Sequence, residues 1–177
     1  VEYGGGTTPP TGSPTPSPTV SPTSSPPACS NPLAGNTFSL GTSGSASISS
    51  AGGGNWDGNP RNPTVFTACG LNGSGAGSTS FDLFLDAGGT VANGTQVRVS
   101  YDLTGNGSWD RVETYRYFAT DPVAGWEHYT QTVGLQGSSG ALGTFSNGKV
   151  QVEIWNAIGN GPTTLGTANQ SFVRMPY

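Results

Sequence analysis

The sequence predicts an all-β protein: an antiparallel β-sandwich of jelly-roll type, preceded by a disordered Pro/Thr/Ser-rich linker. Short runs in which apolar and polar residues alternate recur along the chain, as half-buried strands require. Segments rich in Gly, Asn and Ser separate these runs, and the 177 residues include 29 glycines. No segment shows the 3.6-residue period of an amphipathic helix. The strands are therefore expected to bury their apolar faces against one another.

Residues 1–27 are the predicted interdomain linker and the edge of a fragment. Three glycines lead into Ser/Thr-Pro dipeptides that continue to Pro27. Repeated proline favours an extended polyproline II conformation, and the near absence of apolar residues excludes a packed core. The chain opens at Val1 without a start methionine or an apolar signal sequence. We therefore expect the linker to join a preceding domain to the sandwich formed by residues 28–177.

The folded region contains two weak strand candidates followed by seven clearer ones. In the clearest, Phe81–Asp86, apolar residues at 81, 83 and 85 alternate with acidic residues at 82 and 86. Residues 71–78 are expected to form a polar, glycine-rich loop. In chain order the expected strands are 37–40, 45–50, 65–68, 81–86, 96–101, 111–118, 127–135, 149–158 and 171–177.

Composition excludes several classes of partner. Only 9% of the residues are charged, against about 25% in an ordinary domain. A net charge of −4 argues against binding to nucleic acid or to an anionic membrane. No apolar run approaches the ~20 residues of a membrane helix. These features are typical of secreted, extracellular β-rich proteins, and we expect a monomer.

Two cysteines, Cys29 and Cys69, lie at the start of the folded region. Neither belongs to a CxxC or Cys/His pattern, which argues against zinc. A disulfide closing this loop would stabilise the fold by about 4 kcal/mol in the chain-entropy model. Two buried thiols are the alternative. A disulfide would imply export to an oxidising compartment.

A segment between two predicted strands has the spacing of a calcium-binding loop. A hard cation collects six to eight oxygens, and a glycine permits the sharp turn. Thr stands where an acid is usual at the third position, and the twelfth residue lies in a strand. A plain Asn-Gly hairpin turn is the alternative. The candidate ligands of a structural Ca²⁺ are Asp102, Thr104, Asn106, Ser108, Asp110 and Glu113.

Candidate sugar-binding residues occur in the segment 149–155. Its apolar residues alternate with a polar face that carries Gln151, Glu153 and Trp155. Sugar rings stack on exposed aromatic rings, while amides and carboxylates bond to their hydroxyl groups. We expect Trp155 to be an exposed platform. The alternative is that it packs under a loop or against the second sheet.

Other aromatic residues are further candidates. Trp126 follows a turn-rich loop and precedes Glu127, and Trp56 lies in a glycine-rich loop. Such positions suit ligand contacts, although a loop tryptophan as often covers a core. Trp109 lies within the calcium-like loop, where covering the hairpin is the expected role.

Whether Tyr115 and Tyr117, after this loop, are buried or exposed depends on the hairpin register. If Asp102 pairs with Asp110, Val97 lies opposite Tyr115, and cross-strand neighbours share a face. That register buries the tyrosines in the core, which is our expectation. A slip of one residue would expose Tyr117 as a sugar contact.

The sequence contains little that points to catalysis. A single histidine, His128, excludes a two-histidine copper site, and no G-x-S-x-G elbow occurs. Glycoside hydrolysis needs two carboxylates facing one sugar. Nothing in the sequence pairs them, although Glu127 and Glu153 leave a small sandwich hydrolase as an alternative.

A linker and two sequence motifs carry a resemblance to a known class. A Pro/Thr/Ser linker precedes a Cys-bounded sandwich, Y-D-x-T-G-N-G-S-W-D-R-V-E-T-Y begins at Tyr101, and V-E-I-W-N-A-I-G begins at Val152. Residues 80–177 resemble the accessory modules of secreted bacterial glucan-degrading glycoside hydrolases. The resemblance implies a non-catalytic carbohydrate-binding module that holds a covalently linked, N-terminal catalytic domain on an insoluble glucan. A structural or adhesive cell-surface module is the alternative.

Overall fold

The structure is a computed structural model that describes residues 29–42, 44–48, 60, 62–86, 93–119, 125–134, 141–158 and 163–177. Side chains at 93, 116–119 and 158 are not described. The predicted linker at 1–27 and the candidate Trp56 therefore lie outside the described residues.

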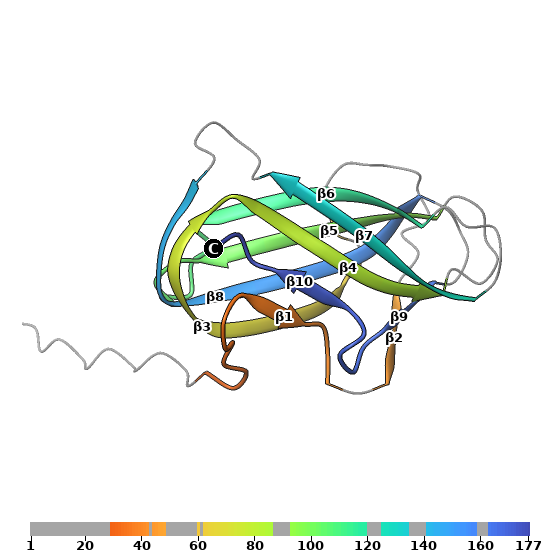
Figure 1. The fold of residues 1–177 in the computed structure, drawn as a ribbon, viewed down its shortest axis with the longest axis horizontal. Helices are drawn as coiled ribbons and strands as arrows, with labels where there is room; N and C mark the ends of the chain where they lie inside the picture. Colours follow the sequence, from red (N-terminus) through yellow and green to blue (C-terminus); the bar gives the residue numbers. More distant parts are fainter. Residues whose placement is uncertain are drawn as a thin grey trace, which may run out of the picture.

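All regular structure in the described residues is β-strand (Figure 1). Within them there is no helix long and apolar enough to cross a membrane. The strands are β1 (Thr37–Ser39), β2 (Ser45–Ile48), β3 (Thr64–Ala76), β4 (Ser78–Asp86), β5 (Asn93–Asp102), β6 (Arg111–Ala119), β7 (Trp126–Gly134), β8 (Ala141–Ile158), β9 (Thr163–Gly166) and β10 (Phe172–Arg174).

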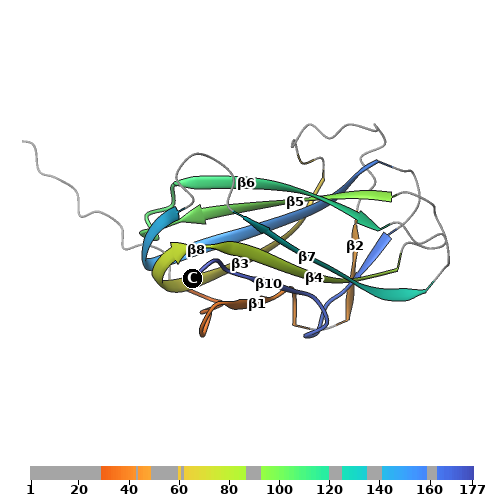
Figure 2. The ribbon, with the colours of Figure 1, turned by 45° about the horizontal axis from the view of Figure 1, so that its top comes forward.

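The strands form two antiparallel sheets that pack face to face (Figures 1 and 2). The larger sheet has the order β1-β10-β4-β9-β2, and β7 pairs with the other edge of β4. The smaller sheet has the order β3-β8-β5-β6. If β1 and β2 are counted as the first strand and β9 and β10 as the last, the sheet orders are 1-8-3-6 and 2-7-4-5. This is the order of a jelly roll, so the predicted fold class is confirmed.

The core lies between the sheets and follows from the alternation seen in the sequence. Phe81, Leu83 and Leu85 of β4 are all at most 2% exposed, as are Val97 and Val99 of β5. Their neighbours along each strand face outward, because successive side chains of a strand point to opposite faces. The even-numbered residues of β4 therefore lie on the outer face of the larger sheet.

The β5–β6 hairpin has the predicted register. The amide of Asp110 donates a hydrogen bond to the carbonyl of Tyr101 (2.8 Å), and Val97 lies opposite Tyr115. Tyr115 is 2% exposed, so the expectation that it is a core residue is confirmed. The side chain of Tyr117 is outside what the structure describes.

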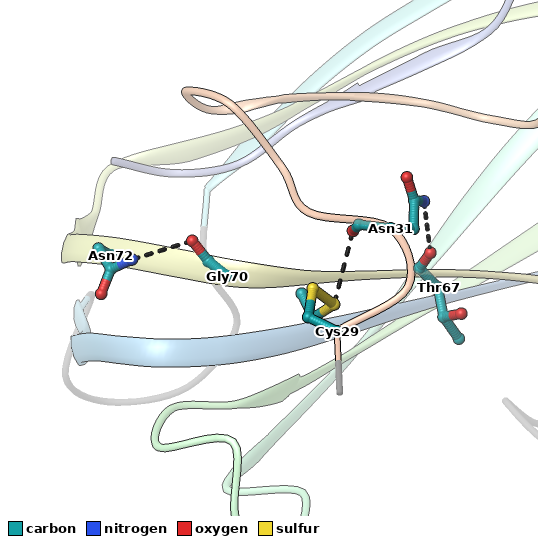
Figure 3. Close-up of a disulfide and its surroundings, with 6 residues drawn as sticks. Cys29, Asn31, Thr67, Gly70 and Asn72 are labelled. Carbon is teal, nitrogen blue, oxygen red and sulfur yellow. Dashed lines mark hydrogen bonds between the residues drawn. A yellow bond between two sulfur atoms is a disulfide. The ribbon is translucent and has the colours of Figure 1, made fainter. Parts of the chain in front are cut away.

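The N-terminal edge of the sandwich is fastened to β3. Cys29 and Cys69 form the predicted disulfide, with their Cα atoms 5.8 Å apart (Figure 3). Beside it, the side-chain amide of Asn31 donates to the carbonyl of Thr67 (2.8 Å), and the amide of Leu33 donates to the carbonyl of Cys69 (2.8 Å). A covalent link and a short bridge of hydrogen bonds thus hold the entry of the chain against the smaller sheet.

Strands β3 and β8 are much longer than the sequence predicts. Residues 71–76, expected to be a loop, continue β3, and β8 begins at Ala141 rather than at Lys149. The two segments pair with each other through register shifts. Gly73 (φ 142°) and Gly143 (φ 110°) adopt conformations that other residues avoid. Glycines that allow such irregular pairing look like loop residues in a sequence.

Candidate ligand-binding face

The predicted platform residue, Trp155, is buried. It is 1% exposed, so the expectation of an exposed platform is wrong and the packed alternative holds. The alternation along β8 places Trp155 on the outer face, as predicted, but Gln96 and Ser100 on this face are also only 2% exposed. Periodicity shows which residues share a face and does not show whether solvent reaches that face.

Glu153, the predicted neighbour of that platform, is engaged in an ion pair. Its two carboxylate oxygens accept hydrogen bonds from the Nε and Nη2 atoms of Arg98, at 2.6 and 3.0 Å. The residue is 5% exposed. This two-point ion pair is largely removed from water and links neighbouring strands β5 and β8. The Glu153 carboxylate is therefore not free to contact a sugar.

Trp126 has the exposure expected of a ligand contact. It begins β7 and is 44% exposed. The adjacent Glu127 is also exposed and accepts a hydrogen bond from the hydroxyl of Tyr129 (3.0 Å). Glu127 lies opposite Leu85 in the β4–β7 register, whereas Trp126 lies opposite Asp86. The two predicted contacts therefore point to different sides of the strand.

Trp126 belongs to a row of aromatic rings. Its indole stacks on the ring of Phe84, with centroids 5.0 Å apart and 23° between the planes. Phe84 also contacts the imidazole of His128, at a centroid distance of 4.5 Å. The register places Phe84 opposite His128, and cross-strand neighbours share a face. The three rings form a continuous aromatic strip on the outer face of the larger sheet.

A groove of about 500 Å³ continues from this strip across the same sheet. Its floor follows two cross-strand rows: Phe172, Asp82 and Thr130 in one, Arg174, Ser80 and Thr132 in the next. Thr37 of β1 closes the far side, because it lies opposite Arg174. The groove therefore crosses β1, β10, β4 and β7. We call the aromatic strip and this groove together the outer binding face.

The polar groups of the groove are of several kinds. His128 Nδ1 lies 2.7 Å from Asp82 Oδ1, and the hydroxyls of Ser80 and Thr132 are 3.0 Å apart. The guanidinium of Arg174 is exposed and forms no ion pair with any residue that the structure describes. Hydroxyls, a carboxylate and a cation thus line a groove that begins beside stacked aromatic rings.

Most of this face was not predicted from the sequence. The segment Phe81–Asp86 nevertheless contains an indication of it. Its alternation places Phe84 on the same outward side of the strand as Asp82 and Asp86. A large aromatic residue on an otherwise acidic face places a ring on the outer side of the sheet, where Phe84 is half-buried. The contributions of β7 and β10 had no local signal, because they depend on which strands become neighbours.

The calcium-like loop uses its own oxygens to bind its backbone. Oδ1 of Asp102 accepts hydrogen bonds from the amides of Thr104 (3.2 Å) and Asn106 (3.1 Å), and Oδ2 accepts one from Gly107 (2.7 Å). Asp110 Oδ2 accepts one from Leu103 (2.7 Å). Asp102 is 1% exposed, so it stabilises the turn from within.

The carboxylate at the twelfth position of the loop is buried and paired. Glu113 is 1% exposed, lies opposite Val99 on the inner face and pairs with Arg111 Nε at 2.5 Å. Its carboxylate is therefore engaged within the sheet. In the part of the chain that is described, no three His, Cys, Asp or Glu residues gather as metal ligands do. Calcium binding by the other loop oxygens of Asp102, Thr104, Asn106, Ser108 and Asp110 stays a prediction.

Comparisons with known proteins give no family for this chain. The sequence matches no protein-family model, and no curated protein matches it.

Proposed function

We propose that this protein is a non-catalytic polysaccharide-binding module that holds an attached secreted glycanase on an insoluble glucan. The observation that carries the proposal is the exposed indole of Trp126, stacked on Phe84 at the end of a polar groove. This combination of a flat apolar surface with hydroxyl and charged groups suits the C–H face of a sugar ring and the hydroxyl groups around its edge.

The stack prepares Trp126 for binding. A pyranose presents C–H groups on its ring faces, and these pack on an aromatic plane. Phe84 supports the indole from beneath, so the platform is already ordered before a ligand arrives. A preorganised side chain loses less conformational entropy on binding.

The length of the face suits an oligosaccharide segment rather than a single sugar. Trp126 and Thr132 are both on β7 and both belong to the outer binding face. Six residues of a strand span about 20 Å. A polysaccharide chain that contacts Trp126 can therefore continue over the hydroxyls of Thr130 and Thr132 towards Arg174.

The carboxylates of this face favour binding over hydrolysis. Asp82 and Asp86 are four residues apart on one strand, which is about 13 Å. The two carboxyl groups of an inverting or retaining glycosidase lie roughly 5–9.5 Å apart. The Asp82 carboxylate is moreover held by His128. The disulfide between Cys29 and Cys69 supports the proposed secretion.

A pull-down tests this function. The protein is incubated with insoluble cellulose, β-1,3-glucan, α-glucan, chitin and xylan, and both depletion from solution and released reducing sugar are measured. We expect retention on a glucan without release of sugar. Release of soluble sugar would instead identify a polysaccharide-active enzyme. Absence of retention on every polysaccharide would overturn the proposal in favour of a structural or adhesive module.

A further inference from the structure

A second groove, of about 290 Å³, lies on the outer face of the smaller sheet. It is formed where the Cys29–Cys69 disulfide, β8 and the β5–β6 turn meet, and its lining includes Trp109, Lys149 and Gln151. Figure 3 shows Asn31 and Thr67 beside the disulfide, and both also line the groove. We call it the disulfide groove.

The disulfide groove is separate from the outer binding face. Trp109 lies in the turn between β5 and β6, whereas Trp126 starts β7 opposite Asp86, the last residue of β4. In Figure 1 the β5–β6 turn and the start of β7 are at opposite ends of the sandwich. The two grooves also belong to different sheets. The two linings share no residue.

Lys149 is the only lysine of the chain, and its ammonium group forms no ion pair with the described residues. Arg98 and Arg111 each pair with a glutamate, but Lys149 forms no such pair with any part of the chain that the structure describes. Its cross-strand neighbour is Asp102, whose two oxygens accept backbone hydrogen bonds within the loop. An ammonium group therefore remains available in the groove.

The other lining groups complement this charge. Trp109 is 44% exposed. The side-chain amide of Gln151 forms no hydrogen bond with the described residues, and the amide nitrogen of Asn31 donates to Thr67, which leaves its carbonyl oxygen as an acceptor. An aromatic plane, one cation and two amides match a sugar ring that bears both hydroxyl groups and a carboxylate.

We propose that the disulfide groove binds a uronic acid unit of an acidic polysaccharide. The ring stacks on Trp109, the carboxylate pairs with the Lys149 ammonium, and the hydroxyl groups bond to Gln151 and Asn31. This site differs from the outer binding face in both position and ligand charge. A single module would thereby engage an acidic chain on one face of the sandwich and a neutral glucan on the opposite face.

The test uses the full chain labelled with ¹⁵N and an oligogalacturonate as the probe, with a neutral cello-oligosaccharide of equal length for comparison. The indole N–H signal of Trp109 is assigned by its loss in Trp109→Ala. We expect the oligogalacturonate to shift this signal. Lys149→Gln should weaken its binding about tenfold, because a charge-assisted hydrogen bond is lost. Lys149→Arg should retain it, and 0.5 M NaCl should weaken it.

Each outcome separates this proposal from the function of the outer binding face. Loss of glucan binding in Trp126→Ala, with the oligogalacturonate shift unchanged, supports two independent sites. An unshifted Trp109 signal at millimolar oligogalacturonate would overturn the proposal, whatever Trp126 does. So would equal affinity for the neutral oligosaccharide, or unchanged affinity in a folded Lys149→Gln variant, because the cation would then play no part.

Discussion

The ring of Phe84 supports the indole of Trp126, with centroids 5.0 Å apart and 23° between the planes. The two residues come from strands far apart in the sequence and meet because β4 and β7 pair over their whole lengths. Trp126 keeps 44% of its surface exposed. Trp126 therefore does not belong to the core of the sandwich. Its stacked ring faces the solvent.

Gly105→Ala should destabilise the protein much more than Gly107→Ala. Both glycines have positive φ, 67° and 93°, which costs an alanine about 1 kcal/mol or more. At Gly105 a Cβ would also collide with the carbonyl oxygen of Asn147, whereas nothing lies near a Cβ at Gly107. Urea unfolding of the two variants measures the difference. Equal urea midpoints for the two variants would contradict this prediction, because they would show that the turn can move to accommodate the added Cβ at no extra cost.

Asp102→Ala should destabilise the protein by about 2 kcal/mol or more, in EDTA as well as in calcium. Its removal leaves three backbone amides without their acceptor. Asp110→Ala, which removes an acceptor for one amide, is the matched control and should cost less. Thermal unfolding in both solutions is the measurement. A loss of stability confined to the calcium-containing solution would assign the role of Asp102 to a bound metal.

Replacing both Cys29 and Cys69 by serine should lower the free energy of unfolding by about 4 kcal/mol, because the cross-link closes a loop across a sequence separation of 40. Chemical denaturation of the oxidised protein and the double variant gives this difference. The oxidised protein treated with iodoacetamide serves as a control and should be unchanged. Coincident unfolding curves for the oxidised protein and the double variant would show that the disulfide does not stabilise the fold.

Stability should fall as the pH rises from about 10 towards 12. Burial raises the pKa of Tyr115 to about 12, with nearby Glu113 adding to the effect, and burial also raises the pKa of Tyr101. In the unfolded chain these phenols ionise near pH 10. As the pH rises, the unfolded state therefore loses these protons before the folded state does. The stability that the two protonated phenols contribute is fully present below pH 10 and is lost as the pH rises to the pKa of the folded state.

Urea midpoints between pH 9 and pH 12, with tyrosinate absorbance followed in parallel, measure this loss. Tyr115→Phe should have a flatter pH dependence, because one of the two buried phenols is absent. A wild-type midpoint that stays constant to pH 12 would contradict the burial of these hydroxyls.

Local features of the sequence were enough to predict the fold class. The alternation in residues 81–86 and 96–101 identified two core strands, and the assumed pairing of Asp102 with Asp110 predicted the register that buries Tyr115. These signals are carried by neighbouring residues. The disulfide between Cys29 and Cys69 was predicted because the chain has only two cysteines and neither lies in a metal-binding pattern.

The candidate site could not be predicted in the same way. Trp155 was placed on the correct face of β8, but the burial of that face is a property of the whole fold. Glu113 had the spacing of a metal ligand, yet the strand directs it inward to Arg111. The groove beside Trp126 joins residues from four strands, so it exists only once the sheet has formed.

Retention of Trp126→Ala on the polysaccharide that holds the wild-type protein tests the central claim most directly. Val112→Ala is the control, since Val112 is 50% exposed and lies on the smaller sheet. Circular dichroism and urea unfolding establish that both variants are folded. We predict that Trp126→Ala loses retention while Val112→Ala keeps it. Unchanged retention of a folded Trp126→Ala variant would contradict the assignment of the outer binding face.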